Sequence, residues 1–339
     1  MTELPGRRRA ILKIIVAEYI ASGNPVASEV IARGYSLGIS PATTRHEMAS
    51  LEEDGYIVRP HTSAGGVPSD KGYRYYVECL IKESKLREDD QLAIRRFFYE
   101  AEPEPEAWAR LAVSILTKKL QGIAIATLPR APLCRFRYVD LVALQDAIVL
   151  LVVVLQDGEI KKRVFSVAEV ASQDQLTAWA NRMNATYKGL SYQQIGSRKL
   201  DLSPIEEEIA EVIMQIMESE DRHEHEQFFL DGWRHLVTQA GFVKGKRILD
   251  LVEALEERRM LVSLLQSLRN ESGIKVTIGN ENEEQALRDC SVILSNYGVD
   301  ERRGAIGVIG PTRMPYSMAI PTVDYVSAVM SDLMSRMPA

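Results

Sequence analysis

The feature that most constrains this chain is the stretch at residues 40–59, SPATTRHEMASLEEDGYIVR. Ser40 is a favourable N-cap, and Pro41 suits the first helical position because its fixed φ and missing N–H cost nothing there. Gly55 favours a helix stop, and the β-branched residues that follow it favour a strand. We therefore expect a short helix at 41–53, followed by a strand.

Only a narrow stripe of this helix is suited to burial. Thr44, Met48 and Leu51 are spaced i, i+4 and i+7, which docks one helix face onto a core. The opposite face combines small residues with hydrogen-bonding ones, and such a face can enter the major groove of DNA. The candidates for base contacts are Thr43, Arg45, His46 and Ser50.

The neighbouring segments predict further helices and a hairpin. Apolar periodicity predicts a first helix at 7–22 and a shorter second helix at 28–34. The loop PHTSAGGVP, at 60–68, is rich in small residues and bounded by prolines. Three helices, a strand, a loop and a return strand are the order of a winged helix-turn-helix. A small helical subdomain that serves oligomerisation is the competing interpretation.

The net charge does not by itself suggest nucleic-acid binding. The chain of 339 residues has a formal net charge of −6, and residues 1–80 balance nine Lys or Arg against nine Asp or Glu. Nucleic-acid binding domains usually have a basic excess, because phosphate contacts supply most of the affinity. The basic groups would therefore have to gather on one face.

Residues around the helix at 41–53 and in the loop are candidates for contacts to phosphate. The N-terminus of a helix attracts anions, and basic side chains position a protein on the duplex. For Lys71 and Arg74, a solvated helix face is the competing interpretation. The full set is Arg7, Arg8, Arg9, Ser40, His61, Thr62, Ser63, Gly65, Gly66, Lys71 and Arg74.

The length of the chain predicts two or three domains. A charged segment at 83–106 ends in AEPEPE and is the best candidate for a linker. A helix at 108–120 follows, and then β-rich runs with a hairpin turn at 156–158 predict an antiparallel sheet. These runs are 123–128, 138–144, 147–155 and 159–167.

Helical patterns at 173–190, 203–220 and 246–268 separate this region from three further strands. Those strands are expected at 274–278, 290–295 and 305–309, before a closing helix at 321–334. We therefore expect an α+β multidomain protein. Its parts are a DNA-binding head at 1–82, a helical and acidic linker at 83–106, a sheet domain at 107–185 and 270–339, and an inserted, mostly helical domain at 186–269. The apolar stripes of the insertion predict dimerisation.

No catalytic residue, metal site or cofactor is predicted. Gly304, Gly307 and Gly310 lack the spacing of a dinucleotide fingerprint, so close packing in a sheet is favoured over phosphate binding. His223 and His225 are spaced i, i+2, which does not place both on one face of a helix. No combination of nucleophile and base is recognisable. The protein is therefore not expected to be an enzyme.

Three further observations bear on location and contacts. Cys79, Cys134 and Cys290 are far apart, which favours free thiols in a reducing compartment. No apolar run has the length of a membrane span, so we expect a soluble, intracellular protein. If it binds DNA, its expected location is cytoplasmic and nucleoid-associated. Arg313 is a candidate for an interdomain ion pair or for a contact to an effector.

Several motifs in order along the chain resemble HrcA, the family of heat-inducible transcription repressors of bacteria. PHTSAGGVPSDKGYRYYVECL, from residue 60, resembles the family pattern PHTSAGRIPTxKGYRxYVD. ISPATTRHEMASLEEDGY, from residue 39, resembles SxATIRNEMAxLExxGYL. The segments IGNEN at 278–282, CSVILSNYG at 290–298 and GAIGVIGPTRMPYS at 304–317 also match.

The resemblance implies a winged-helix head, a GAF-like domain interrupted by an inserted dimerisation domain, and a homodimer. It also implies repression of chaperone operons of the groE and dnaK type through an inverted-repeat operator on double-stranded DNA, with the GroE chaperonin as a modulator. Three positions depart from the family pattern. Gly66 replaces an arginine of the wing, His46 replaces a common Asn, and Thr44 replaces an apolar residue. Because Asn can bond adenine twice, the operator sequence or the affinity is expected to differ.

The sequence therefore predicts a dimeric DNA-binding repressor with its half-sites a multiple of roughly 10 bp apart. Two alternatives remain open. A metabolite-responsive regulator would bind a small effector in the sheet domain, and a ligand-dependent shift in operator binding would identify it. An enzyme would need convergent acid, base or metal groups around Arg313, and the sequence shows none.

Overall fold

The structure is a computed structural model, and it describes residues 4–61, 64–81, 85–130, 133–145, 147–156, 158–167, 170–198, 202–221, 227–238, 246–256, 258–266, 268, 273–299 and 302–337. The chain forms two compact units. The first comprises Met1–Leu128, Phe228–Val299 and Gly304–Ala339, and the second comprises Pro129–Gln227 and Asp300–Arg303. Among the described residues, no helix combines the length and apolar character that a membrane span requires.

The first unit begins with three helices and a hairpin, as predicted. We call residues 4–81 the head. Its elements are α1 (Gly6–Ser22), α2 (Ser28–Gly34), α3 (Pro41–Glu53), β1 (Ile57–Val58), β2 (Val67–Pro68), α4 (Asp70–Tyr75) and a π-helical turn η1 (Tyr76–Leu80). Strands β1 and β2 pair antiparallel, with Ile57 opposite Pro68. Apolar residues of α1, α3 and β1 form the core of the head, since Ile15, Leu51 and Ile57 are completely buried.

The rest of the first unit is built on a five-stranded sheet, which we call the main sheet. Its strand order is β7-β3-β10-β9-β8. The strands are β3 (Ile123–Thr127), β7 (Phe228–Asp231), β8 (Ile274–Ile278), β9 (Cys290–Val299) and β10 (Arg302–Pro311). Pairing is antiparallel between β3 and both of its neighbours and between β8 and β9, which confirms the predicted kind of sheet.

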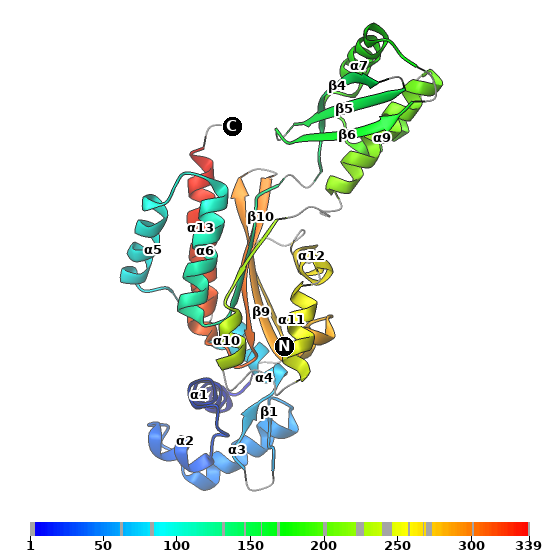
Figure 1. Ribbon diagram of the computed structural model, residues 1–339. Coiled ribbons are helices and arrows are strands. Elements are labelled where there is room, and N and C mark those ends of the chain that lie inside the picture. Colours follow the sequence, from blue (N-terminus) through cyan, green and yellow to red (C-terminus); the bar gives the residue numbers. More distant parts are fainter. Residues whose placement is uncertain are drawn as a thin grey trace. The chain divides into compact units, whose positions relative to one another are not determined.

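Helices cover both faces of the main sheet (Figure 1). On one side lie α6 (Pro105–Leu120) and α13 (Tyr316–Ser335), with α5 (Glu88–Glu100) outside them. On the other side, α11 (Lys246–Glu256) and α12 (Arg258–Gln266) join a second apolar cluster with β3 and β9. The remaining elements are α10 (Trp233–Thr238) and the short 3-10 turns η2 (Gly279–Glu281) and η3 (Gln285–Leu287).

Glycines of β10 allow close packing within the sheet, as the sequence predicts. A Cβ added at Gly307 would lie 2.1 Å from the carbonyl oxygen of Ile293 on the neighbouring strand. At Gly304 it would lie 2.7 Å from the ring of Tyr297. Neither distance is compatible with a side chain, so these positions require glycine for steric reasons within the sheet.

The second unit has its own sheet and its own core. Its elements are β4 (Phe136–Gln145), β5 (Ile148–Leu155), β6 (Ile160–Ser166), α7 (Gln173–Tyr187), α8 (Tyr192–Ser197) and α9 (Pro204–Asp221). The three strands pair in chain order, with β5 in the centre. One face of this sheet contributes alternate residues, such as Leu141, Leu151 and Val153, to a core shared with α7 and α9.

The two compact units divide the chain at different places from the predicted domains. The sequence pattern assigns β4–β6 to the sheet domain, whereas these strands pair with one another in the second unit. It assigns α11 and α12 to the insertion as one helix, whereas they are two helices that pack on the main sheet. Hydrophobic periodicity identifies a strand or a helix, but it does not identify the sheet that the element joins.

The closing helix also differs from its prediction. It begins at Tyr316 rather than at residue 321, so Pro321 lies inside it. Proline commonly marks the first turn of a helix, and this preference is the reason that the sequence places the start too late.

Candidate nucleic-acid interface

The start of α3 has the predicted geometry. The Oγ of Ser40 accepts a hydrogen bond from the backbone N–H of Thr43 at 3.1 Å, and Pro41 occupies the first turn. The hydroxyl of Thr44 donates to the carbonyl of Ser40 at 3.1 Å. Thr44, Met48 and Leu51 are buried, so the predicted inward stripe is confirmed. The polar Thr44 is satisfied at a buried position because its hydroxyl bonds the preceding turn.

The outward face of α3 presents two unpaired side chains. Arg45 and His46 are exposed, and within the described part of the chain neither makes a hydrogen bond or an ion pair. Thr43 and Ser50 are partly exposed, and the hydroxyl of Thr43 lies 2.9 Å from that of Ser40. Arg45 and His46 are therefore the residues of this face that are free to contact a ligand.

The basic cluster at the start of α1 braces α3. Arg8 donates through Nε to Glu47 at 3.0 Å and through Nη1 to Asp54 at 3.2 Å, and Arg7 lies 3.5 Å from Glu47. These pairs neutralise acidic groups of α3 and its C-cap, which lowers the negative charge beside the outward face. Arg9 lines a separate hollow of about 310 Å³ with Lys13 and Cys79.

Lys71 supports the other end of α3. Its Nζ donates to the backbone carbonyl of Asp54 at 2.6 Å and lies 4.4 Å from the centre of the Tyr56 ring. A cation at the C-terminal end of a helix complements the helix dipole, and the aromatic face adds a cation–π contact. The side chain of Lys71 therefore has internal contacts to Asp54 and Tyr56, although it remains exposed.

The loop between β1 and β2 is anchored to the start of α2 by two glycines. Gly66 and Val26 exchange two backbone hydrogen bonds of 2.9 Å each. A Cβ at Gly65 would lie 2.3 Å from the carbonyl carbon of Val26, so only glycine fits there. His61 is exposed, whereas Thr62 and Ser63 lie outside the described residues.

Position 66 faces the core of the head. A Cβ at Gly66 would lie 3.0 Å from Cδ1 of Ile57 and 3.1 Å from Cε of Met48. The first carbon of any side chain at this position therefore points inward. A side chain at position 66 would therefore have to pack beside Ile57 and Met48 before it could reach solvent.

A groove connects α3 with this loop. Its volume is about 410 Å³. It is lined by Ala27, Ser28, Glu29, Arg45, Met48, Arg59, Ala64 and Gly65. Arg59 is not predicted as a site residue from the sequence, because a single basic residue at a strand end is a weak signal. In the structure it lies on the same groove as Arg45, with its Nε 3.3 Å from Glu52.

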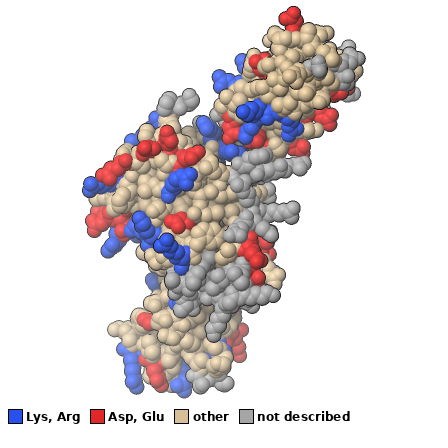
Figure 2. All heavy atoms as spheres, viewed as in Figure 1, with Lys and Arg blue, Asp and Glu red and all other residues tan. Residues whose placement is uncertain are grey.

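Basic and acidic side chains are mixed on the surface of the head. Figure 2 shows both signs side by side on the visible face of this part of the molecule, without one large basic patch. This agrees with the zero net charge of residues 1–80. Binding of DNA by this head would depend on the local geometry of a few side chains more than on a strong overall field.

Arg74 is held away from the role of a phosphate contact. Its Nε donates to Oε1 of Glu281 at 2.8 Å, its Nη2 contacts Oε2 of the same carboxylate, and Nη2 also donates to the carbonyl of Val276 at 2.7 Å. These bonds to Glu281 raise the pKa of Arg74 above its ordinary value. The structure therefore favours an internal contact, which local sequence could not indicate because the partner is 207 positions away.

Comparison with known proteins gives one family. A family model described as the HrcA protein C terminal domain matches residues 106–320. The heat-inducible transcription repressor HrcA of Dehalococcoides mccartyi (strain ATCC BAA-2266 / KCTC 15142 / 195) is 39% identical over 335 residues, covering 98% of this chain and 97% of that protein. The protein of the same name from Roseiflexus castenholzii (strain DSM 13941 / HLO8) is 37% identical over 344 residues, covering 99% and 96%.

A solved structure supports the fold. The crystal structure of a hypothetical protein at 2.2 Å resolution matches with a TM-score of 0.63 and 24% identity, covering 98% of this chain and 99% of that chain. At this identity the similarity concerns the fold alone.

Proposed function

The chain belongs to the HrcA family of heat-inducible transcription repressors, which are not enzymes, and we propose that it binds an inverted-repeat operator of chaperone operons as a homodimer. The observation that carries this proposal is the outward face of α3, where Arg45 and His46 are exposed and unpaired beside a groove that includes Arg59. In this proposal the head is a winged helix-turn-helix, and the main sheet with its helices is the GAF-like domain. Modulation by the GroE chaperonin is part of the same proposal.

In the proposed complex, α3 enters the major groove. Arg45 and His46 contact base edges, with Thr43 and Ser50 beside them. Arg59 and the loop between the strands follow the neighbouring phosphates, and the exposed Arg7 adds a further positive charge, while Arg8 contributes by neutralising Glu47 and Asp54. The groove of about 410 Å³ lies between α3 and this loop, so it is the surface on which one phosphate chain would lie.

The proposal is tested by binding to the inverted repeat upstream of the chaperonin operon of the source organism. We expect a gel shift with this duplex at nanomolar protein, a concentration typical of specific binding. A duplex with one scrambled half-site is expected to bind at least about tenfold more weakly, because one head then loses its base contacts. Equal affinity for the two duplexes would contradict sequence-specific repression by a dimer.

Arg45→Ala is expected to remove specificity rather than general affinity. A bidentate contact from arginine to a base contributes about 1–3 kcal/mol of discrimination. The measurement is the ratio of the affinity for the operator to that for an unrelated duplex. Arg96→Ala is a matched control, because Arg96 is an exposed arginine of α5, paired with Glu100 and outside the head. An unchanged ratio for Arg45→Ala would exclude a base contact.

We also propose which surface forms the homodimer. The apolar stripes of the predicted insertion are used inside the chain, since α9 packs on the inner face of β4–β6 and α11 and α12 pack on the main sheet. The outer face of these strands is instead apolar and open to solvent. Its apolar residues are Tyr138, Val142, Ile148, Leu150, Val152, Val154, Ile160 and Val164. A patch of this kind on a folded protein is typical of an interaction site.

The outer face is suited to a second copy of itself. Its middle row runs from Asp140 through Val152 to Lys162. A two-fold axis parallel to β5 would place Asp140 of each copy opposite the partner's Lys162. The apolar rows on either side, Val142–Leu150–Val164 and Tyr138–Val154–Ile160, would each meet the same row of the second copy. Such an interface is self-complementary, as a two-fold symmetric dimer requires.

A further inference from the structure

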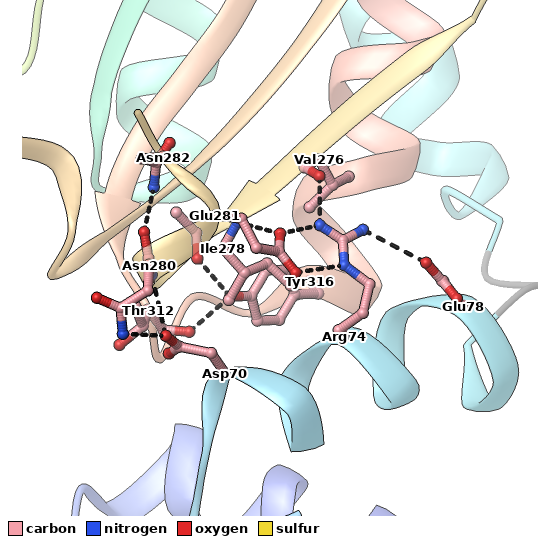
Figure 3. Close-up of polar contacts among 12 residues, drawn as sticks. Asp70, Arg74, Glu78, Val276, Ile278, Asn280, Glu281, Asn282, Thr312 and Tyr316 are labelled. Atoms are coloured by element: carbon pink, nitrogen blue, oxygen red, sulfur yellow. Dashed lines mark hydrogen bonds and ion pairs between the residues drawn. The ribbon is translucent and has the colours of Figure 1, made fainter. Parts of the chain in front are cut away.

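Two side chains on one side of α4 attach the head to a loop beside the main sheet. Figure 3 shows Asp70 and Arg74, one helical turn apart, facing the turn η2. The Oδ2 of Asp70 accepts one hydrogen bond from the backbone N–H of Asn280 at 2.9 Å and another from its Nδ2 at 2.8 Å. The head is therefore held at one point by a carboxylate with two donors from a single residue.

Arg74 and Glu281 make the second attachment. Their two parallel contacts form a forked pair, and the bond to the carbonyl of Val276 fixes the guanidinium in a third direction. The two side chains are only 21% and 34% exposed, so solvent screens this pair less than it screens a surface pair. Forked pairs of this type constrain orientation as well as distance. We call Asp70, Arg74, Asn280 and Glu281 the head joint.

The loop that receives the head is held by hydrogen bonds of its own. The side-chain amide of Asn282 is buried and donates to the carbonyls of Gly279, Leu287 and Cys290 at 2.9, 3.0 and 3.1 Å. The Oε2 of Glu281 also accepts from the backbone N–H of Ile278 at 2.8 Å. These internal bonds help to fix the positions from which Asn280 and Glu281 contact the head.

The approach of the head to this loop requires a glycine. Gly279 has a φ of +54°, and a Cβ there would lie 2.4 Å from the carboxylate of Asp70. The carboxylate can therefore reach the backbone of the loop only because position 279 has no side chain. This requirement explains the glycine of the IGNEN motif by a contact with the head.

An apolar layer accompanies the polar contacts. The rings of Tyr73 and Tyr316 lie 5.7 Å apart. In addition to this apolar contact, the charged guanidinium of Arg313 lies beside Gly23, at the end of α1. The buried residues of the head and one face of the main sheet belong to a single apolar cluster. Apolar contact favours association of the two parts, but it is non-directional, so the polar pairs must define the angle.

We propose that the four residues of the head joint are positioning residues for DNA binding. They fix the direction in which α3 projects from the main sheet, and they thereby set the distance between half-sites that the dimer accepts. This inference rests on the proposed function. The mechanical link from α4 to α3 is direct, because Gly72 of α4 lies against the backbone of Tyr56, just after α3. A head attached only by a flexible connection would tolerate many half-site spacings.

The experiment uses the full-length protein and duplexes that the wild-type protein selects from a random pool. Three versions are compared: the selected duplex, one with its spacer lengthened by about half a helical turn, and one with a single half-site. For the wild type we expect a loss of about a hundredfold on the lengthened duplex, since both heads can no longer bind together.

Arg74→Ala is expected to relax this discrimination. Its affinity for the selected duplex should fall about tenfold, while the lengthened duplex should bind within about threefold of the selected one. Its affinity for a single half-site should stay within about twofold of the wild type, because no base contact is changed. The matched control is again Arg96→Ala, which should keep the full wild-type discrimination.

Glu281→Gln distinguishes an effect on the orientation of the head from an effect on its folding. Glu281 lies outside the head, and glutamine keeps its size while it removes the charge of the forked pair. We expect the same loss of spacing discrimination with an unchanged single half-site affinity. The inference is overturned if both Arg74→Ala and Glu281→Gln keep the full wild-type preference for the selected duplex over the lengthened one. It is also overturned if Glu281→Gln loses affinity equally for all three duplexes. Failure of the wild type to select any duplex would instead contradict the proposed function.

Discussion

Gly72→Ala is expected to destabilise the head by more than about 3 kcal/mol and to abolish operator binding. A Cβ at position 72 would lie 2.1 Å from the carbonyl oxygen of Tyr56 and 3.2 Å from its carbon. Both neighbours are backbone atoms, so no side-chain rotation relieves the clash. Ser69 holds the same turn in place, since its N–H donates to the Tyr56 carbonyl at 3.1 Å and its hydroxyl donates to the Gly55 carbonyl at 2.6 Å.

The measurement is thermal unfolding by calorimetry together with a gel shift on the operator. We expect an early transition for the head in the Gly72→Ala protein and no shift at nanomolar protein. Gly34→Ala is the matched control, because Gly34 is the last residue of α2 and a Cβ there would have no neighbour within 4 Å. That variant should melt and bind like the wild type. Wild-type binding by Gly72→Ala would show that α4 can move away from Tyr56 without loss of function.

The start and the buried stripe of α3 are predictable because their signals are local. Ser40 and Pro41 specify the first turn, and the spacing of Thr44, Met48 and Leu51 specifies the inward face. These residues need no information from the rest of the chain. The boundaries of the helix and its two faces therefore follow from the sequence.

The role of Arg74 is not predictable in the same way. Its position on a helix that follows the loop between β1 and β2 is equally compatible with a phosphate contact and with an internal ion pair. The choice is made by Glu281, which the fold brings to it from 207 positions away. The direction of a side chain at position 66 is not predictable from the sequence either. Only the packing of Met48 and Ile57 shows that the first carbon of such a side chain would point inward.

The proposed dimer surface illustrates a further limit of periodicity. The helices of the predicted insertion have apolar stripes, but a stripe does not reveal whether its partner is in the same chain or in another one. The sheet β4–β6 provides that partner for α9, and the main sheet provides it for α11 and α12. Within the described residues, the opposite face of β4–β6 stays at least partly exposed, and its apolar residues on β5 alternate with the buried ones, which gives that strand a continuous hydrophobic pattern.

Val164→Glu is expected to separate the dimer into monomers. Val164 is 56% exposed and lies in a row with Leu150 and Val142 on the outer face of β4–β6. An uncompensated carboxylate buried in an interface costs about 3–5 kcal/mol, and two-fold symmetry introduces it twice. The fold of the monomer should be unaffected, because the same side chain is solvated in the absence of a partner.

The measurement is the molar mass by light scattering over a range of protein concentrations, with binding to the operator and to a single half-site. We expect a monomer that binds the single half-site like the wild type but loses the preference for the inverted repeat, since avidity requires two linked heads. Val170→Glu introduces the same change at an exposed valine of the same unit outside the three strands, and it should remain dimeric. A dimer of undiminished stability in Val164→Glu would exclude this face of the sheet. Loss of the dimer in both variants would show that added negative charge, rather than this surface, is responsible.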